Sequence, residues 1–287
     1  MVRVLPPGRA ADLLHGVPFG QPAHPAVVRV PIGCWTSAVL LDWLGGRGRE
    51  AERASAILLA AGVAAALPAA ATGLADWAAL HTHQQRVGLA HAIAQTGATL
   101  LFTGSLLARA AGRRGNGVAL AAGGLATATV GGYLGGYLAM RLGAGSSHAE
   151  SVGHLAAIGW LDLCPLAELP PGRPVRRQLG YLSLLAVRAG EVVYVLSDQC
   201  SHLGGPLHQG RLVVDRDDAC VVCPWHGSTF RLTDGSVRRG PATARQPAFE
   251  TRISQAGLVQ VRPLQASAAA KPAQRPWLPR PFRSAAG

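Results

Sequence analysis

Four apolar stretches in the first half of the chain constrain its fold more than any other feature. They cover residues 25–44, 54–75, 87–108 and 117–140. Each is close to the roughly 20 residues that a helix needs to cross a hydrocarbon layer of about 30 Å. Because these stretches lack a polar face, a soluble alanine-rich bundle is disfavoured. The sequence therefore predicts an all-α transmembrane four-helix domain over residues 24–145.

The fourth stretch is rich in glycine at four-residue spacing, with Gly131 and Gly135 in one series and Gly132 and Gly136 in another. Small residues at this period let two helices approach closely in lipid. Arginines are concentrated in the first and third gaps between the stretches. The positive-inside rule then places those gaps in the cytoplasm and both chain termini, with the second half of the chain, on the outer face.

The ionisable residues His91, Asp42 and Asp76 lie in or beside the predicted spans and are candidates for a function. Ionisable groups within a span are energetically costly and often functional. His91 is a candidate for ligating haem, relaying a proton or contacting a quinone. A hydrogen bond from one helix to another is the plainer account of this histidine.

After Gly145 the pattern changes to short strands separated by Asp, Gly and Pro clusters. Two strands flank a turn at Ala189-Gly190. Further strands are expected near residues 211–214, 219–223, 229–232 and 257–262. This spacing indicates a small antiparallel all-β sandwich or barrel over residues 146–263.

The remaining segments are expected to lie outside the two domains. Residues 1–23 are predicted to be flexible, and the Pro-, Ala- and Arg-rich residues 264–287 to form a disordered tail. The net charge is +12, but Lys271 is the only lysine and no compact basic, aromatic-interleaved face is evident. Nucleic acid is therefore not an expected partner. Five cysteines at irregular spacing do not make a disulfide framework.

Two cysteine–histidine pairs stand where predicted strands end. Cys200-x-His202 lies in CSHLGGPLHQG, and Cys223-x-x-His226 lies in CPWHGSTF. Two thiolates and two imidazoles on two loops define a four-ligand site for a soft or borderline metal. Tetrahedral zinc and a two-iron cluster with mixed ligands are both candidates. In a Rieske-type 2Fe-2S centre, histidines replace the cysteines on one iron, which requires one cysteine and one histidine from each loop.

These two motifs resemble the C-x-H and C-x-x-H signature of Rieske iron–sulfur domains, and the likeness spans roughly residues 156–262. It implies that Cys200 and Cys223 bind the inner iron of a 2Fe-2S cluster, and that His202 and His226 bind the outer, more exposed iron. The segment RGPATARQPAFE resembles the proline-bearing loop that shields the cluster. The residues expected to surround the cluster are Leu203, Gly204, Gly205, Pro206, Trp225, Gly227, Ser228, Phe230 and Pro241.

The chain departs from the Rieske proteins of cytochrome bc complexes at three positions. Gly205 and Trp225 stand where those proteins carry a disulfide, and Phe230 stands where they commonly carry a tyrosine that donates to a cysteine sulfur. Ser228 keeps its family position and is expected to donate to a bridging sulfide. Losing a donor disfavours reduction, so the reduction potential is predicted in the low part of a range of about −150 to +300 mV.

The first half resembles a four-helix bacterial membrane domain of unknown function (DUF2231-like), through HPAVVRVPIG, GLAHAI and GGYLGGYLAMRLG. This likeness brings no established chemistry. It places the protein in a bacterial cell membrane as a multi-pass protein.

The leading hypothesis is a membrane-anchored carrier of single electrons, whose partner is a redox protein or a quinone-linked membrane complex. No independent catalytic site is evident. No histidine follows His226, so the separate iron site of a Rieske oxygenase is not expected. Two alternatives stay open: a 2Fe-2S redox or nitric-oxide sensor that signals through the membrane helices, and a zinc-stabilised binding module.

Overall fold

The computed structural model describes residues 8–45, 48–152 and 159–264. The predicted tail beyond Leu264 lies outside the described residues. The chain divides into two compact units. The described part of the first covers residues 22–45 and 48–145, and that of the second covers residues 8–21, 146–152 and 159–264.

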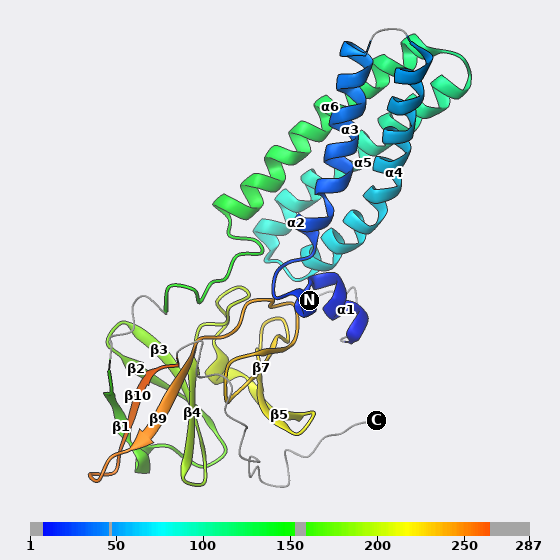
Figure 1. Cartoon of the computed structure of the whole chain (residues 1–287). Helices are drawn as coiled ribbons and strands as arrows, with labels where there is room; N and C mark the ends of the chain where they lie inside the picture. The colour runs from blue at the N-terminus through cyan, green and yellow to red at the C-terminus, as the bar shows by residue number, and fades with distance from the viewer. Residues whose placement is uncertain (1–7, 46–47, 153–158, 265–287) are drawn as a thin grey trace. The chain divides into compact units, whose positions relative to one another are not determined.

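The first unit is built from helices (Figure 1). They are the short α2 (His24–Val27), then α3 (Arg29–Leu44), α4 (Arg49–Ala78), α5 (Thr82–Ala110) and α6 (Arg114–Gly136), which continues into a π turn, η2 (Tyr137–Arg141). The four long helices coincide with the four predicted stretches. Among the described residues, three segments are long and apolar enough to cross a membrane: His24–Leu44, Arg49–Ala78 and Arg114–Arg141. Helix α5 is not among them, so a crossing by α5 remains a prediction.

Polar side chains explain why α5 is the least apolar of the long helices. Gln84 Nε2 donates to Leu142 O at 2.9 Å, Ser105 Oγ donates to Gly117 O at 2.6 Å, and His91 Nδ1 lies 2.7 Å from Gly131 O. All three acceptors are backbone carbonyls of α6 or of the residue after η2. The expectation that no stretch has a polar face is therefore wrong for α5, whose polar groups are paired inside the unit.

Glycines on neighbouring helices make room for the aromatic core of this unit. Trp35 stacks on Phe102 with ring centroids 4.4 Å apart, and both side chains are buried. A Cβ at Gly62 would overlap the Trp35 indole, and one at Gly124 would lie 3.0 Å from Phe102 Cε1. The close approach of the helices therefore depends on these glycines.

The second unit contains two antiparallel sheets. The six-stranded sheet has the order β1 (Leu161–Pro165), β10 (Leu258–Pro263), β9 (Ala248–Ile253), β4 (Val192–Ser197), β3 (Leu182–Ala189) and β2 (Pro174–Leu179). The four-stranded sheet has the order β5 (Arg211–Asp215), β6 (Asp218–Val222), β7 (Thr229–Arg231) and β8 (Val237–Arg239). This arrangement confirms the predicted antiparallel all-β fold.

Strand β3 is buried on both faces, because alternate side chains of a strand point in opposite directions. Leu185 and Val187 belong to a core shared with the four-stranded sheet, whereas Leu184 and Ala186 belong to a second core. This double burial accounts for the almost continuous apolar run of β3. The first of the two cores also contains Cys200 and Cys223, so the cysteines lie between the sheets.

The strands expected near residues 211–214 and 219–223 are confirmed by β5 and β6, which form a hairpin. Asp215 pairs with Asp218, and the two residues between them, Arg216 and Asp217, have φ of 50° and 66°. Two successive positive φ angles are the geometry of a tight two-residue hairpin turn.

The N-terminal segment differs from the flexible residues 1–23 that the composition suggested. Within its described part, Arg9–His15 form helix α1, Gly16 ends that helix with φ of 89°, and Val17–Phe19 form a 3₁₀ turn, η1. Ala11 and His15 are buried. Contacts with residues distant in the sequence order this segment, and such contacts cannot be read from the composition of the segment itself.

Candidate iron–sulfur centre

The predicted metal-binding residues lie on two loops of the second unit. The first loop, residues 198–208, leads from β4 into η4 (Leu207–Gln209), and the second loop, residues 223–228, joins β6 to β7. A third loop, residues 240–247, joins β8 to β9. The names first, second and third loop are kept below.

The first and second loops close in the same way. In each, the cysteine carbonyl accepts from the N–H four residues later: Gly204 donates to Cys200 at 2.8 Å, and Gly227 donates to Cys223 at 3.1 Å. The cysteine N–H in turn donates to the carbonyl five residues later. Gly204 and Gly227 have φ of 78° and 82°, a conformation that glycine adopts without strain. The spacing from cysteine to glycine therefore determines the loop geometry locally.

The four candidate ligands gather as two like pairs. The thiol of Cys200 hydrogen-bonds to that of Cys223, and both side chains are buried. The rings of His202 and His226 lie with centroids 4.9 Å apart at an interplanar angle of 84°. Among the described residues, no three His, Cys, Asp or Glu side chains are grouped around one point in a way that suits a single metal ion.

Backbone N–H groups surround the two sulfur atoms. Those of His202 and Leu203 are directed at the Cys200 sulfur, and those of Trp225 and His226 at the Cys223 sulfur. The hydrogen bond from Cys200, helped by these N–H groups, lowers the pKa of Cys223 to about 7. The same bond and burial raise the pKa of Cys200 well above its ordinary value. In this arrangement negative charge is favoured on the Cys223 sulfur and disfavoured on that of Cys200.

Gly205 brings the two loops into contact. A Cβ there would lie 2.9 Å from Cys223 Sγ and 3.0 Å from Trp225 Cδ2. No larger side chain fits without movement of the second loop. The two positions that carry a disulfide in the cytochrome bc relatives are thus neighbours in space, and here the Trp225 indole fills that position.

The third loop braces the other two. Ser228 Oγ accepts from Ala242 N at 3.0 Å, next to the cis Gly240–Pro241 peptide. Gln246 is buried, and its Nε2 donates to the carbonyls of Ser197 and Gln199 while its Oε1 accepts from Ser201 N. Pro241, expected from the sequence beside the site, therefore lies in a loop bonded to both the first and the second loop.

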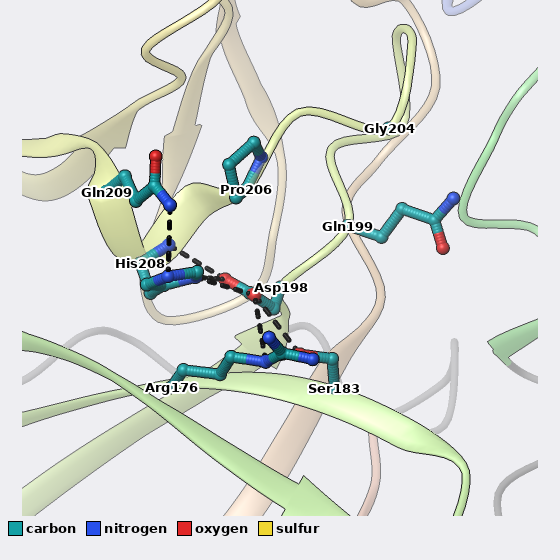
Figure 2. A pocket seen from close by; sticks show the side chains of 8 residues that line it. All are labelled: Arg176, Ser183, Asp198, Gln199, Gly204, Pro206, His208 and Gln209. Atoms are coloured by element: carbon teal, nitrogen blue, oxygen red, sulfur yellow. Dashed lines mark hydrogen bonds and ion pairs between the residues drawn. The ribbon is translucent and has the colours of Figure 1, made fainter.

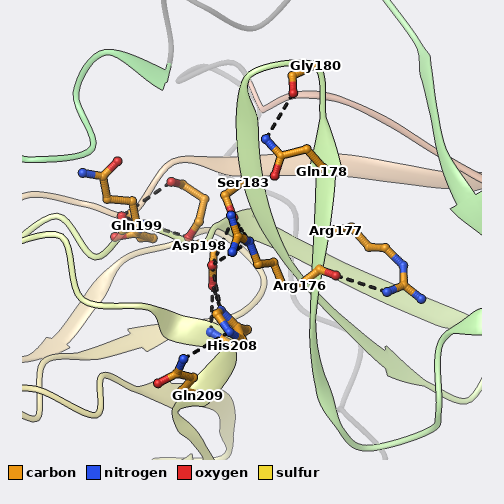
Figure 3. A network of polar contacts seen from close by, with 11 residues as sticks. Arg176, Arg177, Gln178, Gly180, Ser183, Asp198, Gln199, His208 and Gln209 are labelled. Atoms are coloured by element: carbon orange, nitrogen blue, oxygen red, sulfur yellow. Dashed lines mark hydrogen bonds and ion pairs between the residues drawn. The ribbon is translucent and has the colours of Figure 1, made fainter.

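Asp198 anchors the first loop from the side of the six-stranded sheet. Its carboxylate accepts from His208 N at 2.7 Å and lies 2.8 Å from His208 Nδ1. Ser183 Oγ, on β3, donates to it at 3.1 Å. Figure 2 shows these side chains around an open hollow of about 320 Å³, lined by Arg176, Ser183, Asp198, Gln199, Gly204, Pro206, His208 and Gln209. In Figure 3, Asp198 stands at the centre of the network.

Sequence reasoning missed Asp198 and Gln246. Asp198 precedes Cys200 by two residues, and that proximity was the one available signal. Gln246 bonds to residues 45 to 49 positions away, and nothing in its local sequence reports those contacts. His208, which sequence reasoning also did not place at the site, is held by Asp198.

Other candidates have structural roles. Phe230 is buried in the core that contains both cysteines. Cys220 is also buried in β6, and its Sγ lies 3.6 Å from the carbonyl of Asp218. Burial is the main cause that raises the pKa of Cys220 to about 12. Cys220 is therefore a protonated core thiol.

The three candidates in the helical unit are also placed. Asp42 forms a bidentate ion pair with Arg109, and both side chains are almost fully buried. His91 makes the interhelical bond already described, and its ring lies 6.4 Å from that of His24. Asp76 is in the last turn of α4 and acts electrostatically on His24. The plain account of His91, a hydrogen bond between helices, agrees with this geometry.

Comparison with known proteins matches each half of the chain to a family. The model of the Rieske [2Fe-2S] domain matches residues 159–250, and that of a predicted membrane protein family (DUF2231) matches residues 20–148. The chain is 36% identical over 80 residues to the 3-phenylpropionate/cinnamic acid dioxygenase ferredoxin subunit of Escherichia coli (strain K12). That match covers 28% of this chain and 72% of the relative.

Solved structures give matches over the second half. The ferredoxin of carbazole 1,9a-dioxygenase from Nocardioides aromaticivorans IC177 is 25% identical, with a TM-score of 0.33, over 37% of this chain and 98% of that one. A chain in the complex of reduced oxygenase and oxidized ferredoxin in carbazole 1,9a-dioxygenase is 30% identical, with a TM-score of 0.31, over 36% and 92%.

Two antiparallel sheets that present facing cysteine and histidine pairs define an iron–sulfur protein of the electron-carrying class. The chain belongs to the Rieske [2Fe-2S] domain family, here joined to a DUF2231 domain. Its cofactor is a Rieske-type 2Fe-2S cluster.

Proposed function

We propose that Cys200, His202, Cys223 and His226 hold the cluster, and that the protein carries single electrons between redox partners at a membrane. The main support for this assignment is that the Cys200 and Cys223 thiols lie together and the His202 and His226 rings lie together. It supplies each of two irons with two like ligands, as the Rieske arrangement requires. When bound, the cluster accepts and releases one electron.

The burial of the four residues supports a direction for electron exchange. Cys200 and Cys223 are 1% and 3% exposed and face the core between the sheets. His202 and His226 are half-buried, and Trp225 beside them is 40% exposed. The histidine side is therefore the face offered to a partner, while Trp225 limits the access of water.

The relatives support a protein partner. They are ferredoxin subunits of dioxygenases, so an oxygenase or a reductase that exchanges electrons with this chain is the partner we favour. A quinone-linked membrane complex is the second candidate. Anchoring in the lipid bilayer of the bacterial cell membrane raises the effective concentration of the carrier near either partner.

Contacts within the second unit bear on how many helices cross the membrane. Residues 8–21 precede the first helix of the helical unit, yet Asp12 bonds to Gly240 in the second unit, which follows the last helix. Both flanks must then lie on one side of the bilayer, which requires an even number of crossings. We infer that α5 crosses as a fourth span, and the arginine distribution favours the outer face for both flanks.

Spectroscopy and metal analysis test the proposed cluster. The reduced full-length protein is expected to show a Rieske-type electron paramagnetic resonance (EPR) signal, with two irons and two acid-labile sulfides per chain. Cys223→Ser should lose iron and the EPR signal. Cys220→Ser, which changes the buried thiol of strand β6 just before Cys223, should keep both. Zinc in place of iron would support the binding module instead.

Electron exchange separates carrier from sensor. Stoichiometric electron exchange between the purified protein and isolated membranes is expected of a carrier. If the cluster is present but exchanges no electrons with membranes or with an oxygenase system, the sensor hypothesis replaces the carrier.

A further inference from the structure

The N-terminal helix α1 packs against the third loop within the second unit. Asp12 Oδ1 accepts from Gly240 N at 3.0 Å, and Asp12 Oδ2 lies 3.5 Å from Arg239 Nη1. The Asp12 side chain is only 15% exposed, which strengthens both interactions. These contacts join residues more than 220 positions apart in the chain.

Gly240 is closely enclosed by this segment. A Cβ at Gly240 would lie 3.0 Å from Val17 Cγ2 and 3.3 Å from His15 Cδ2. His15 is itself buried. The segment therefore contacts the start of the third loop by packing as well as by hydrogen bonds.

A short series of bonds leads from Asp12 to the second loop. Asp12 accepts a hydrogen bond from Gly240 N. Two residues after Gly240, Ala242 N donates to Ser228 Oγ at 3.0 Å. Ser228 is fully buried and lies two residues after His226. A hydroxyl that accepts a hydrogen bond becomes a better donor of its own proton.

We propose that Asp12 is a positioning residue for the iron–sulfur centre: through Gly240 and Ala242 it fixes the orientation of Ser228, and residues 8–21 are a structural part of the iron–sulfur unit. This inference rests on the proposed cluster site. Asp12 does not touch the ligands. It acts by holding the third loop against the second loop.

The position of α1 in the sequence places this contact next to the helical unit along the chain. Residue 21 is followed directly by the helical unit. Ser146 provides the other covalent connection between the two units. The iron–sulfur unit is thus attached to the membrane domain at both ends of that domain.

The test compares Asp12→Asn with Asp162→Asn in the full-length protein. Asp162, on β1, accepts from Gln260 Nε2 at 2.7 Å in an exposed contact, so its variant controls for the same chemical change elsewhere. In D12N the acceptor loses its charge, and the amide nitrogen must face one of the two donors, Gly240 N–H or the Arg239 guanidinium. Hydrogen exchange of the peptide 239–245 should therefore accelerate about tenfold or more. The EPR g-values should change and the reduction potential should fall, since Ser228 becomes a weaker donor.

Each outcome decides the proposal. Faster exchange with altered g-values and potential supports it, provided that D162N matches the wild type. Exchange equal to that of D162N would overturn the contact, and faster exchange with unchanged g-values and potential would overturn the positioning role. A wild-type protein without iron or an EPR signal would refute the proposed function instead, and the exchange data would still report on the contact.

Discussion

Asp198 and His208 join the two ends of the first ligand-bearing loop, with Asp198 Oδ2 2.8 Å from His208 Nδ1 and Asp198 Oδ1 2.7 Å from His208 N. The Asp198 side chain is 6% exposed. Leu207 N also donates to the Asp198 carbonyl at 2.8 Å. The ends of the loop are thus fixed by the buried Asp198 carboxylate.

Asp198→Asn should destabilise the iron–sulfur unit. An amide nitrogen would face the N–H or the imidazole of His208, so a buried charge-assisted hydrogen bond is lost, at a cost of roughly 1.5–3 kcal/mol. Thermal unfolding of the full-length protein and the rate of iron release would measure this. Glu250→Gln, which removes one half of an exposed ion pair with Arg262, is the control and should stay near the wild type. Equal stability of both variants would contradict the anchoring role.

Gln246→Ala should weaken the brace between the third loop and the first. The substitution leaves three backbone groups, two of them in buried bonds, without the side chain that bonds to them in the wild type. We expect a loss of roughly 2–4 kcal/mol in the free energy of unfolding. Gln246→Glu, which keeps the acceptor for Ser201 but loses the donor, should be destabilised as well. Denaturant unfolding measures both, and a loss below about 0.5 kcal/mol in either would be inconsistent with the observed bonds.

Phe230→Tyr should raise the reduction potential. The Phe230 ring shares a buried core with Cys200 and Cys223, and we expect a hydroxyl introduced there to donate towards sulfur. One hydrogen bond of about 1 kcal/mol that favours the reduced form corresponds to roughly 40 mV for one electron. Phe249→Tyr, in the other core, is the matched control and should leave the potential unchanged. Voltammetry showing no difference between the two variants would reject the tuning argument.

Cys220 should resist alkylation in the folded protein. Its pKa is raised by burial from 9.0 to about 12, so at pH 9 its thiolate fraction is roughly 500-fold below that of the unfolded chain. The corresponding stability is fully present below pH 9 and is lost as the pH rises towards 12. Mass spectrometry after iodoacetamide treatment, with a urea-unfolded sample as reference, would measure this. Rapid labelling of Cys220 in the folded protein at pH 9 would disagree with burial as the cause.

Gly131→Leu should destabilise the helical unit, whereas Gly132→Leu should not. A Cβ at Gly131 would lie 2.8 Å from Gln95 Cδ on α5, while a Cβ at Gly132 meets nothing within 4 Å. Overpacking costs about 1–3 kcal/mol, and the two variants share the same helix and the same gain in helix propensity. Thermal unfolding in detergent compares them. If the Gly132 variant lost more thermal stability than the Gly131 variant, the other face of α6 would be the one that packs against α5.

The geometry of the first and second loops was largely predictable because its information is local. The bonds from Gly204 to Cys200 and from Gly227 to Cys223 span four residues, so the spacing of cysteine, histidine and glycine specifies each loop directly. The hairpin of β5 and β6 was predictable for the same reason. The ordered N-terminal segment was not, because Asp12 gains its partner from a loop 228 residues away.

The sequence by itself determined the two cysteine–histidine motifs, the four apolar stretches and the antiparallel strands. Each of these is a short-range pattern enforced by backbone geometry and by burial of apolar side chains. Only the tertiary structure decided which glycine series of α6 faces α5, since Gly131 with Gly135 and Gly132 with Gly136 are equivalent as patterns. It also decided that Asp12, Asp198 and Gln246 brace the loops. A hydrogen bond between distant residues depends on the folded position of both partners, and neither partner's neighbours in the chain encode that position.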